Sequence, residues 1–333
     1  NCNGHAITGA HQPERYGIYV RDASNVSIRN CVVERFETGI RLSGADNAIL
    51  QLNVTRENSR YGMEFTQAST GALIEGNDIL DNSDEGIHLS GPSDRDAGHS
   101  ILGNLITGNA SEGVYLLESD GNIVAGNEIR NQGKAGIYVK TSDRNVIYQN
   151  TLTMNPLQIM DGSRLNSLIG NSVIGGSVGI SVMGDRNSVT ENVVTGTTFG
   201  GVTVQGTENF LSCNWIADNP IGVYFGEMAT PNRVVMNSIA GNLIGLDATE
   251  LPSDLPAIDA AENWWGCTEG PGSAGCDPAT GNVDASLPEP VEPSDADGDG
   301  ARDACDSCTD IDGDGFGDPG FPASTCPRDN CPD

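Results

Sequence analysis

The sequence is poor in basic residues: 17 Lys and Arg stand against 46 Asp and Glu, and the formal net charge is −29. This charge argues against a nucleic-acid partner and against electrostatic docking on anionic lipid, because both need a basic surface. No stretch is long and apolar enough to span a membrane. Aromatic residues make up only 5%, and no amphipathic helical pattern is present, whereas glycine occurs 43 times. A helical fold is therefore disfavoured.

What the chain does contain is a repeat. Asparagines recur at steps of 21 to 27 residues, most of them two residues before an aliphatic residue, as in Asn77-Asp-Ile79. Self-similarity at this period is typical of a solenoid, in which each repeat buries its apolar face by stacking on the next. We expect these amides to stack inside the coils and to hydrogen-bond along the axis. The ten positions are Asn30, Asn53, Asn77, Asn104, Asn127, Asn150, Asn171, Asn192, Asn214 and Asn237.

A second pattern runs in phase with the first, about nine residues later. Each instance has Gly, an aliphatic residue, a variable residue and another apolar residue, as in Gly86-Ile-His-Leu89 and Gly136-Ile-Tyr-Val139. This alternation indicates short strands that follow a glycine bend. A leucine-rich repeat has a similar period but needs Leu-x-x-Leu-x-Leu and a helical half, which are missing here. The sequence therefore predicts an all-β fold, a right-handed parallel β-helix of about eleven coils with an irregular C-terminal tail.

Composition divides the chain into three parts. We expect the solenoid over residues 1–285, with a closing segment at about 258–285 in which Trp264 and Trp265 cover the last coil. A stiff Pro-rich linker follows over 286–294, and an acidic tail over 295–333. Both ends of the sequence are abrupt, and we expect the chain to be a piece of a larger protein.

The tail contains the spacing Asp-x-Asp-x-Asp-Gly twice, with a further Asp at position 9 each time. Carboxylates at positions 1, 3, 5, 9 and 12 around a Gly at position 6 form an oxygen cage suited to calcium. A solvated acidic run is the simpler alternative, but random acidity does not repeat such a spacing. The second block has Phe321 at position 12. The predicted calcium ligands are Asp295, Asp297, Asp299, Asp303 and Asp306, then Asp310, Asp312, Asp314 and Asp318.

Nine cysteines indicate an oxidising compartment and leave at least one thiol unpaired. Cys267 and Cys276 bracket a Gly/Pro turn, and we expect a disulfide to close it. Zinc is disfavoured in the tail, because its cysteines are surrounded by carboxylates without a histidine. The other disulfide candidates are Cys305, Cys308, Cys326 and Cys331. The sequence thus predicts a secreted protein, located outside the cell or on its surface.

Two resemblances rest on these motifs. The first aspartate block resembles the thrombospondin type 3 repeat, including Cys308 two positions after its last Asp; the second resembles it less, because of Phe321 and an insertion over 319–325. That resemblance implies calcium-wrapped, disulfide-linked extracellular modules. The Asn-x-Ile and Gly-Ile-x-Val patterns resemble the right-handed β-helix repeat proteins, including NosD-like and pectate-lyase-like families, over roughly residues 1–265. This group implies the fold but not one function, because it includes lyases, hydrolases, epimerases, adhesins and structural proteins.

The variable residue of each Gly-led strand should point outward, about 4.8 Å from its counterpart one coil away. Arg41, Glu64, His88 and Tyr115 then form a patch with a cation, an acid/base pair and a phenol. Such a patch suits removal of the proton next to a sugar carboxylate, as in a lyase or epimerase. A plain half-exposed β-face with structural pairs is the alternative. Aromatic candidates for sugar stacking on the same face are Tyr19, Tyr115, Tyr138 and Tyr224.

Three functions stay open: a structural role, sugar binding and catalysis. No Asp-Pro-His-Asp stretch and no aspartate cluster of the epimerase or hydrolase type is present. We therefore predict an extracellular, calcium-stabilised structural or adhesive protein, such as a fibre subunit that joins head to tail through open strand edges. The alternative is a polysaccharide-binding or polysaccharide-processing β-helix protein. The expected partners are Ca²⁺, further copies of the chain and a polysaccharide.

Overall fold

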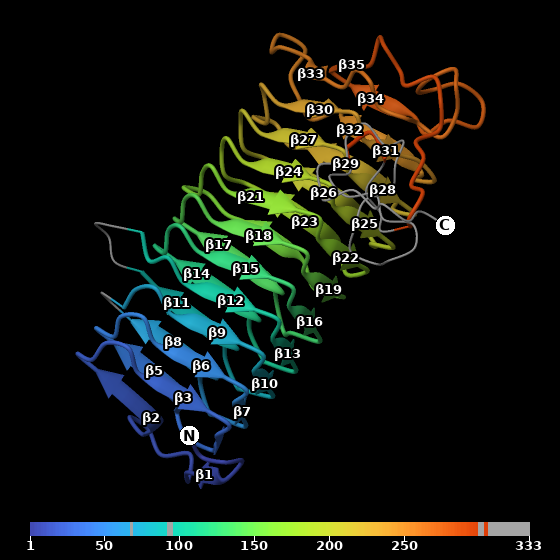
Figure 1. Ribbon diagram of the computed structural model, residues 1–333. Coiled ribbons are helices and arrows are strands. Elements are labelled where there is room, and N and C mark those ends of the chain that lie inside the picture. Colours follow the sequence, from blue (N-terminus) through green and yellow to red (C-terminus); the bar gives the residue numbers. More distant parts are fainter. Residues whose placement is uncertain (67–68, 92–95, 299–302, 306–333) are drawn as a thin grey trace, which may run out of the picture.

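The computed structural model describes residues 1–66, 69–91, 96–298 and 303–305. These residues form 35 short β-strands, all paired in parallel, in three sheets of 11, 12 and 12 strands. The chain visits the sheets in turn, so each turn of the solenoid adds one strand to each sheet (Figure 1). The predicted right-handed parallel β-helix is confirmed, with about twelve turns in place of eleven. Within the described residues, no helix is long and apolar enough to cross a membrane.

We name the sheets A, B and C. Sheet A contains β1 (Ala6–Thr8), β4 (Val32–Glu34), β7 (Val54–Arg56), β10 (Asp78–Leu80), β13 (Leu105–Thr107), β16 (Glu128–Arg130), β19 (Thr151–Thr153), β22 (Ser172–Ile174), β25 (Val193–Thr195), β28 (Trp215–Ala217) and β31 (Ser238–Ile239). Sheet B contains β2 (Tyr16–Arg21), β5 (Thr38–Ser43), β8 (Met63–Thr66), β11 (Ile87–Ser90), β14 (Val114–Leu117), β17 (Ile137–Lys140), β20 (Leu157–Ile159), β23 (Val178–Val182), β26 (Gly200–Val204), β29 (Ile221–Phe225), β32 (Ile244–Ala248) and β34 (Ala279–Gly281). Sheet C contains β3 (Ser27–Arg29), β6 (Ile49–Gln51), β9 (Leu73–Glu75), β12 (Ser100–Leu102), β15 (Ile123–Ala125), β18 (Val146–Tyr148), β21 (Ser167–Ile169), β24 (Ser188–Thr190), β27 (Phe210–Ser212), β30 (Arg233–Val235), β33 (Ile258–Asp259) and β35 (Val283–Asp284).

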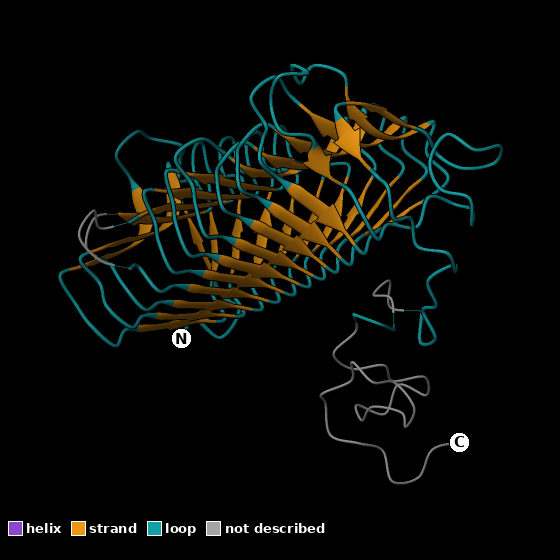
Figure 2. Ribbon diagram, turned by 90° about the horizontal axis from the view of Figure 1, so that it is seen from above, coloured by secondary structure: helices purple, strands orange, loops and turns teal. Residues whose placement is uncertain are grey.

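The glycine that precedes most sheet B strands is required by close backbone packing. A Cβ atom on Gly62 would lie 2.6 Å from the carbonyl oxygen of Gly86, and one on Gly86 would lie 2.7 Å from that of Gly113. The following aliphatic residues, such as Ile87 and Leu89, are completely buried. Each turn thus brings apolar side chains from all three sheets into one core cluster. The strands that supply them stack turn upon turn along the axis (Figure 2).

The predicted asparagine ladder exists and is buried. Asn127 shows the pattern: its Oδ1 accepts hydrogen bonds from the backbone N and from the Nδ2 of Asn104, each at 2.9 Å. Its own Nδ2 donates to Asn150 Oδ1 at 2.8 Å and to the Ile101 carbonyl at 2.9 Å. The same hydrogen bond, from a backbone N–H to the Oδ1 of the next asparagine, links each turn to the next from Asn53 to Asn263. Asn263 was not among the ten predicted positions.

One position of the predicted ladder is wrong. Asn30 is only half-buried and lies one residue before the ladder position, which Cys31 occupies. The Cys31 backbone N–H donates to Asn53 Oδ1 at 3.1 Å, and its sulfur is bonded to Cys2. In that coil a disulfide takes the place of the amide stack.

Two further polar ladders line the other corners of the coil. One lies five residues after the first ladder and includes Asn58, Asn82, Asn109, Gln132, Asn155, Thr197, Asn219 and Asn242. Asp277, 14 residues after Asn263, accepts from Asn242 and ends it. The other lies five residues before it and includes His99, Asn122, Asn145, Asn166, Asn187, Asn209 and Asn232. The spacing Asn-x4-Asn-x4-Asn was readable in the sequence, but only its central member was recognised.

The closing segment continues the solenoid and covers its end. β33 and β35 extend sheet C, and β34 extends sheet B. Trp265 is completely buried, and Trp264 is 7% exposed and forms a bridge to Ser238. The two tryptophans therefore lie against the last full turn.

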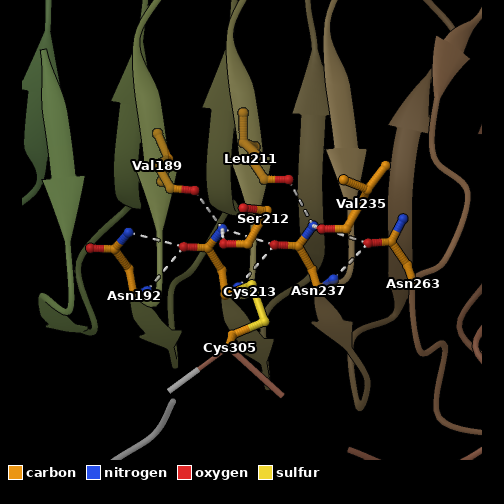
Figure 3. The surroundings of a disulfide bond; sticks show 10 residues. Val189, Asn192, Leu211, Ser212, Cys213, Val235, Asn237, Asn263 and Cys305 are labelled. Atoms are coloured by element: carbon orange, nitrogen blue, oxygen red, sulfur yellow. Dashed lines mark hydrogen bonds between the residues drawn. A yellow bond between two sulfur atoms is a disulfide. The ribbon is translucent and has the colours of Figure 1, made fainter. Parts of the chain in front are cut away.

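Disulfides join three pairs of cysteines in the described residues: Cys2–Cys31, Cys213–Cys305 and Cys267–Cys276. The last closes the Gly/Pro turn as expected. Cys213 precedes Asn214 of the first ladder and has a φ of 61°, at a corner where other turns have glycine, such as Gly126. That conformation directs its side chain away from the core, where it meets Cys305 (Figure 3). Disulfides of this kind are typical of compartments outside the cytosol.

Candidate functional site

The outward residues of sheet B form a row with one residue per turn. Strand register pairs each predicted residue with the next, in the order Tyr19, Arg41, Glu64, His88, Tyr115, Tyr138, Gln158, Ser181, Thr203 and Tyr224. The patch expected from the sequence is therefore contiguous. The whole outward row is less exposed than expected, since Glu64 is 6% exposed and both Ser181 and Thr203 are buried.

Residues in the loops that lead into the sheet B strands complete this surface. We use the name sheet B strip for Tyr16, Tyr19, Glu37, Arg41, Arg60, Tyr61, Glu64, Asp84, Glu85, His88, Glu112, Tyr115, Lys134 and Tyr138.

Arg41 lies at the N-terminal end of the strip and is held there through its Nη1 and the face of its guanidinium group. Its Nη1 donates to the Tyr16 hydroxyl at 2.7 Å and lies 3.3 Å from Glu64 Oε2. Its guanidinium carbon stands 4.7 Å from the Tyr16 ring centre and 5.9 Å from that of Tyr19. The Thr38 hydroxyl also donates to Glu64 Oε2, at 3.5 Å. The ion pair between Arg41 and Glu64 is thus part of the packed sheet surface, as expected for a half-exposed β-face with structural pairs.

His88 is held between aromatic rings. It stacks on Tyr61 with ring centres 4.7 Å apart and meets the edge of Tyr115 at 5.3 Å. Its Nδ1 lies 3.9 Å from Glu85 Oε1, and both Nδ1 and Glu85 Oε2 are buried without a hydrogen-bond partner among the described residues. The carboxylate of Glu85 next to Nδ1 favours the tautomer with the proton on Nδ1, which leaves Nε2 as an acceptor.

The pKa values of the adjacent carboxylates Asp84 and Glu85 are shifted in opposite directions. Burial, together with the charge of Glu85, raises the pKa of Asp84. Burial opposes ionisation of Glu85 as well, but the nearby His88 and the backbone N–H of Glu85 hold its pKa below the ordinary value. Glu85 is therefore the member of the pair that carries the negative charge beside His88.

Three phenols of the strip, those of Tyr61, Tyr115 and Tyr138, stay protonated at neutral pH because their pKa values are raised. Burial, strengthened by the charge of Glu85, raises the pKa of Tyr61 to about 12. Burial also raises the pKa of Tyr115 and Tyr138, and the charge of Glu112 acts in the same direction on both. His88 thus lies in a row with three protonated phenols.

The four predicted sugar-stacking tyrosines do not form one track. Tyr115 and Tyr138 are adjacent, with ring centres 5.2 Å apart, and continue the aromatic row from Tyr61 and His88. Tyr19 pairs with Tyr16 at the N-terminal end of the strip. Tyr224 lies four turns beyond Tyr138, beyond Gln158, Ser181 and Thr203, and contacts Phe199 instead.

Sequence reasoning missed the residues that precede the glycine bends. Tyr61, Glu85 and Glu112 stand directly before Gly62, Gly86 and Gly113, and they surround His88 and Tyr115. The sequence does contain a signal for them: the residue directly before the glycine is polar or aromatic and changes from one turn to the next, as the outward residues do.

The described part of the acidic tail is already folded into a loop. The Ala296 backbone N–H donates to Asp303 Oδ1 at 2.8 Å, and that of Gly298 donates to Asp295 Oδ1 at 2.9 Å. Positions 1 and 9 of the first predicted calcium block thus come together. Asp299, Asp306, Asp310, Asp312, Asp314, Asp318, Cys308, Cys326 and Cys331 lie outside the described residues.

Comparison with known families identifies the solenoid. The family described as "Periplasmic copper-binding protein (NosD)" matches residues 1–97 and 158–251, which is more than half of the chain. The chain belongs to the NosD family. A second family, described as "Right handed beta helix region", matches residues 67–187.

Individual proteins are similar over part of the chain or in fold only. The tail spike protein of Salmonella phage epsilon15 is 30% identical over 135 residues, which cover 34% of this chain and 13% of that protein. The A-module of the mannuronan C-5 epimerase AlgE6 of Azotobacter vinelandii has a TM-score of 0.65 at 15% identity, over 85% of this chain and 86% of that one. A mannuronic acid-specific polysaccharide family 6 lyase from human gut microbiota has a TM-score of 0.43 at 12% identity, over 73% and 76%. Likeness at these identities shows the fold alone.

The family description names copper, and the described residues do not fit a copper centre. One group of three potential His, Cys, Asp or Glu ligands is present among them: Cys267, Glu269 and Cys276. Its two sulfurs are joined in a disulfide and are not thiolate ligands. His99 is buried and accepts a hydrogen bond from Ala72, and His88 is packed between rings. Soft nitrogen and sulfur ligands of the kind copper prefers do not converge.

Proposed function

We propose that the chain binds a polysaccharide along the sheet B strip. The observation that supports this most is the aromatic row of Tyr61, His88, Tyr115 and Tyr138, whose ring centres follow one another at 4.7 to 5.3 Å. Tyr61 is buried and supports the row by stacking on His88, whereas the half-buried Tyr115 and Tyr138 offer a sugar chain apolar ring surface and phenol hydroxyls together.

The relatives support a glycan ligand more than a fibre. The similar solved structure with a TM-score of 0.65 is named as a mannuronan C-5 epimerase module, an enzyme that acts on a polysaccharide. Head-to-tail assembly into a fibre stays a prediction. Sedimentation of the purified chain with calcium tests it, and a monodisperse monomer at high concentration would contradict it.

Catalysis is the second candidate, with His88 as base and the Tyr115 phenol as proton donor. A lyase or epimerase that acts on uronates also needs a cation for the substrate carboxylate. Arg41, the cation in the outward row, is already paired with Glu64 at 3.3 Å. We therefore expect no unsaturated uronate products or epimerised residues from the parent protein or from the double variant Glu64→Ala/His88→Ala. Products from the parent that vanish in the double variant would establish the enzyme instead.

A matched pair of tyrosine variants tests glycan binding. Tyr138→Ala removes an aromatic ring from the strip, whereas Tyr148→Ala removes one from β18 on sheet C of the same turn. On a panel of immobilised polysaccharides, Tyr138→Ala should weaken binding about tenfold and Tyr148→Ala should leave it unchanged. Equal effects of the two variants, or no binding by the parent to any glycan, would refute the proposal.

We also propose that the acidic tail binds calcium and that the protein works outside the cell. The proposal is supported by the repeated aspartate spacing and by the loop that joins Asp295 to Asp303 through Ala296 and Gly298. Calorimetric titration of the full chain with Ca²⁺ should show saturable binding that is lost in the double variant Asp295→Asn/Asp297→Asn. Identical heats for parent and variant would exclude the first block as a site.

A further inference from the structure

The charged groups of the sheet B strip are paired, and carboxylates outnumber cations. Arg41 contacts Glu64 at 3.3 Å, and Lys134 contacts Glu112 at 3.6 Å. Arg60 lies 3.8 Å from Glu37 and 3.9 Å from Asp84. With Glu85, the strip carries five carboxylates and three fixed cations. A polyanionic glycan would meet like charge here and find each of these cations already paired.

The strip already shows how it holds a cation. The guanidinium of Arg60 lies over the Tyr61 ring at 4.3 Å, and that of Arg41 lies over Tyr16 at 4.7 Å. In both places the cation also contacts a carboxylate. An aromatic face beside a carboxylate is a favourable environment for an ammonium or guanidinium group.

Tyr115 and Tyr138 repeat this environment without a cation over their rings, although Lys134 pairs with Glu112 nearby. Among the described residues, no arginine or lysine lies over either ring. Carboxylates act on both rings: Glu85 and Glu112 on Tyr115, and Glu112 and Asp161 on Tyr138. Next to Tyr115, Glu85 Oε2 is buried and accepts no hydrogen bond from a described residue. Neither ring face is thus covered by a cation of the described residues, and Lys134, the cation paired with Glu112, has a largely exposed side chain that a ligand ammonium group can displace.

Resting on the proposed polysaccharide function, we propose that the glycan is an amino-sugar polymer with free ammonium groups, recognised at Tyr115 and Tyr138 by their rings and by Glu112. The overall charge of −29 favours approach of a polycation in the same way. Sugar rings stack along the aromatic row, and each ammonium group lies over a tyrosine face near a carboxylate.

The experiment compares three oligosaccharides that differ in charge. Calorimetry of the full chain is carried out with a β-1,4-linked glucosamine hexamer, with its N-acetylated form and with a mannuronate hexamer. We expect the glucosamine hexamer to bind about tenfold more tightly than the acetylated form, as loss of one desolvated cation–π contact implies. Its affinity should fall with added salt, and mannuronate should not bind measurably.

Three variants locate the recognition. Glu112→Gln should abolish the preference for glucosamine over the acetylated hexamer, and Tyr138→Ala should weaken binding of both. Glu128→Gln makes the same change of charge on sheet A of the neighbouring turn and should leave the preference intact. If Glu112→Gln fails to fold, the loss of binding in Tyr138→Ala and the salt dependence of the parent still decide the question.

The outcomes separate this inference from the function beneath it. Equal affinity for the acetylated and free hexamers, with Tyr138→Ala weakening both, overturns the ammonium proposal and keeps the polysaccharide face. Tighter binding of mannuronate overturns it in favour of a uronate ligand. Absence of binding to all three, and to the wider glycan panel, overturns both proposals.

Discussion

Two sets of positions recur once per turn in this solenoid, and they follow opposite rules. The first ladder position holds asparagine in every turn from Asn53 to Asn263. The outward position of sheet B changes at almost every turn, from Arg41 through Glu64 and His88 to Tyr115. An interior amide must donate to and accept from its neighbour above and below, so only the same group satisfies the stack. An outward side chain faces solvent and its neighbours only, and it is free to vary.

The comparison shows where each kind of information lies in a repeat protein. Positions that hold the same residue in every turn specify the coil. Positions whose residue changes from turn to turn indicate the surface that binds a ligand. The rule also has an informative exception inside the coil. His99 stands in a ladder of asparagines and is 2% exposed, where a titratable group replaces an amide.

The largest expected effect comes from breaking the invariant set. Asn127→Leu removes four hydrogen bonds: the buried backbone N–H of Asn104 loses its acceptor, the Asn104 side-chain amide keeps only the Ile74 carbonyl, and the Ile101 carbonyl loses a donor. We expect a loss of roughly 3 kcal/mol in the free energy of unfolding, since each unsatisfied buried group costs about 1–3 kcal/mol. Urea unfolding followed by circular dichroism measures it.

The control for this prediction is Thr151→Leu, an exposed residue of β19 on sheet A. It should change the free energy of unfolding by less than about 0.5 kcal/mol. A neutral Asn127→Leu variant would show that the stacked amides contribute less than their geometry implies.

The second prediction concerns pH and the histidine in the third ladder. Burial lowers the pKa of His99 to about 4, although the charge of Asp46 acts in the opposite direction. The unfolded chain therefore binds a proton at a higher pH than the folded chain does, and stability falls as the pH drops from about 6.5 towards 4. The loss attributable to His99 should approach roughly 3 kcal/mol at the acid end.

His99→Asn is the matched variant, because it restores the amide found at the other ladder positions. Its unfolding free energy should decline less than that of the parent between pH 7 and pH 4, while the two agree more closely near pH 7. Parallel curves would show that His99 is not buried in its neutral form. The surrounding carboxylates titrate equally in both proteins and cancel in the difference.

The fold was predictable because a solenoid repeats its evidence. Ten asparagines and the Gly-led strands each pointed to the same coil, and the outward row of sheet B followed from the two-residue period of a strand. The error at Asn30 arose because Cys31 replaces the ladder residue in that turn, so the nearest asparagine was taken for it.

The rest depended on geometry that spacing does not contain. Tyr61 and Glu85 reach His88 only because the chain bends at the following glycine, which breaks the alternation of a strand. The Cys213–Cys305 disulfide joins residues 92 apart in the sequence. It requires a corner residue that points outward and a tail that returns to it, and neither is visible in a sequence pattern.

The third prediction tests whether the residues of the sheet B strip can change without loss of stability. Glu64 is 6% exposed and compensates the charge of Arg41, whose Nε is buried without a partner. Glu64→Gln keeps the shape and removes the charge. We expect a loss of about 1–2 kcal/mol, less than for a fully buried pair because Arg41 is partly solvated. Thermal and urea unfolding measure it, and the double variant Arg41→Met/Glu64→Gln should recover part of the loss.

The smallest expected effect on stability sharpens the comparison within a single strand. Tyr138 points outward from β17, and its neighbour Ile137 is completely buried. Tyr138→Leu should change the free energy of unfolding by less than about 0.5 kcal/mol, because its ring contacts only the edge of the strip, whereas Ile137→Ala should cost about 2–4 kcal/mol through the cavity it leaves. Glycan affinity should respond in the reverse order, with a clear loss for Tyr138→Leu and none for Ile137→Ala at temperatures where both are folded. If the two variants weaken glycan binding equally, the outward row does not form the binding surface, and the division between interior and strip does not describe this protein.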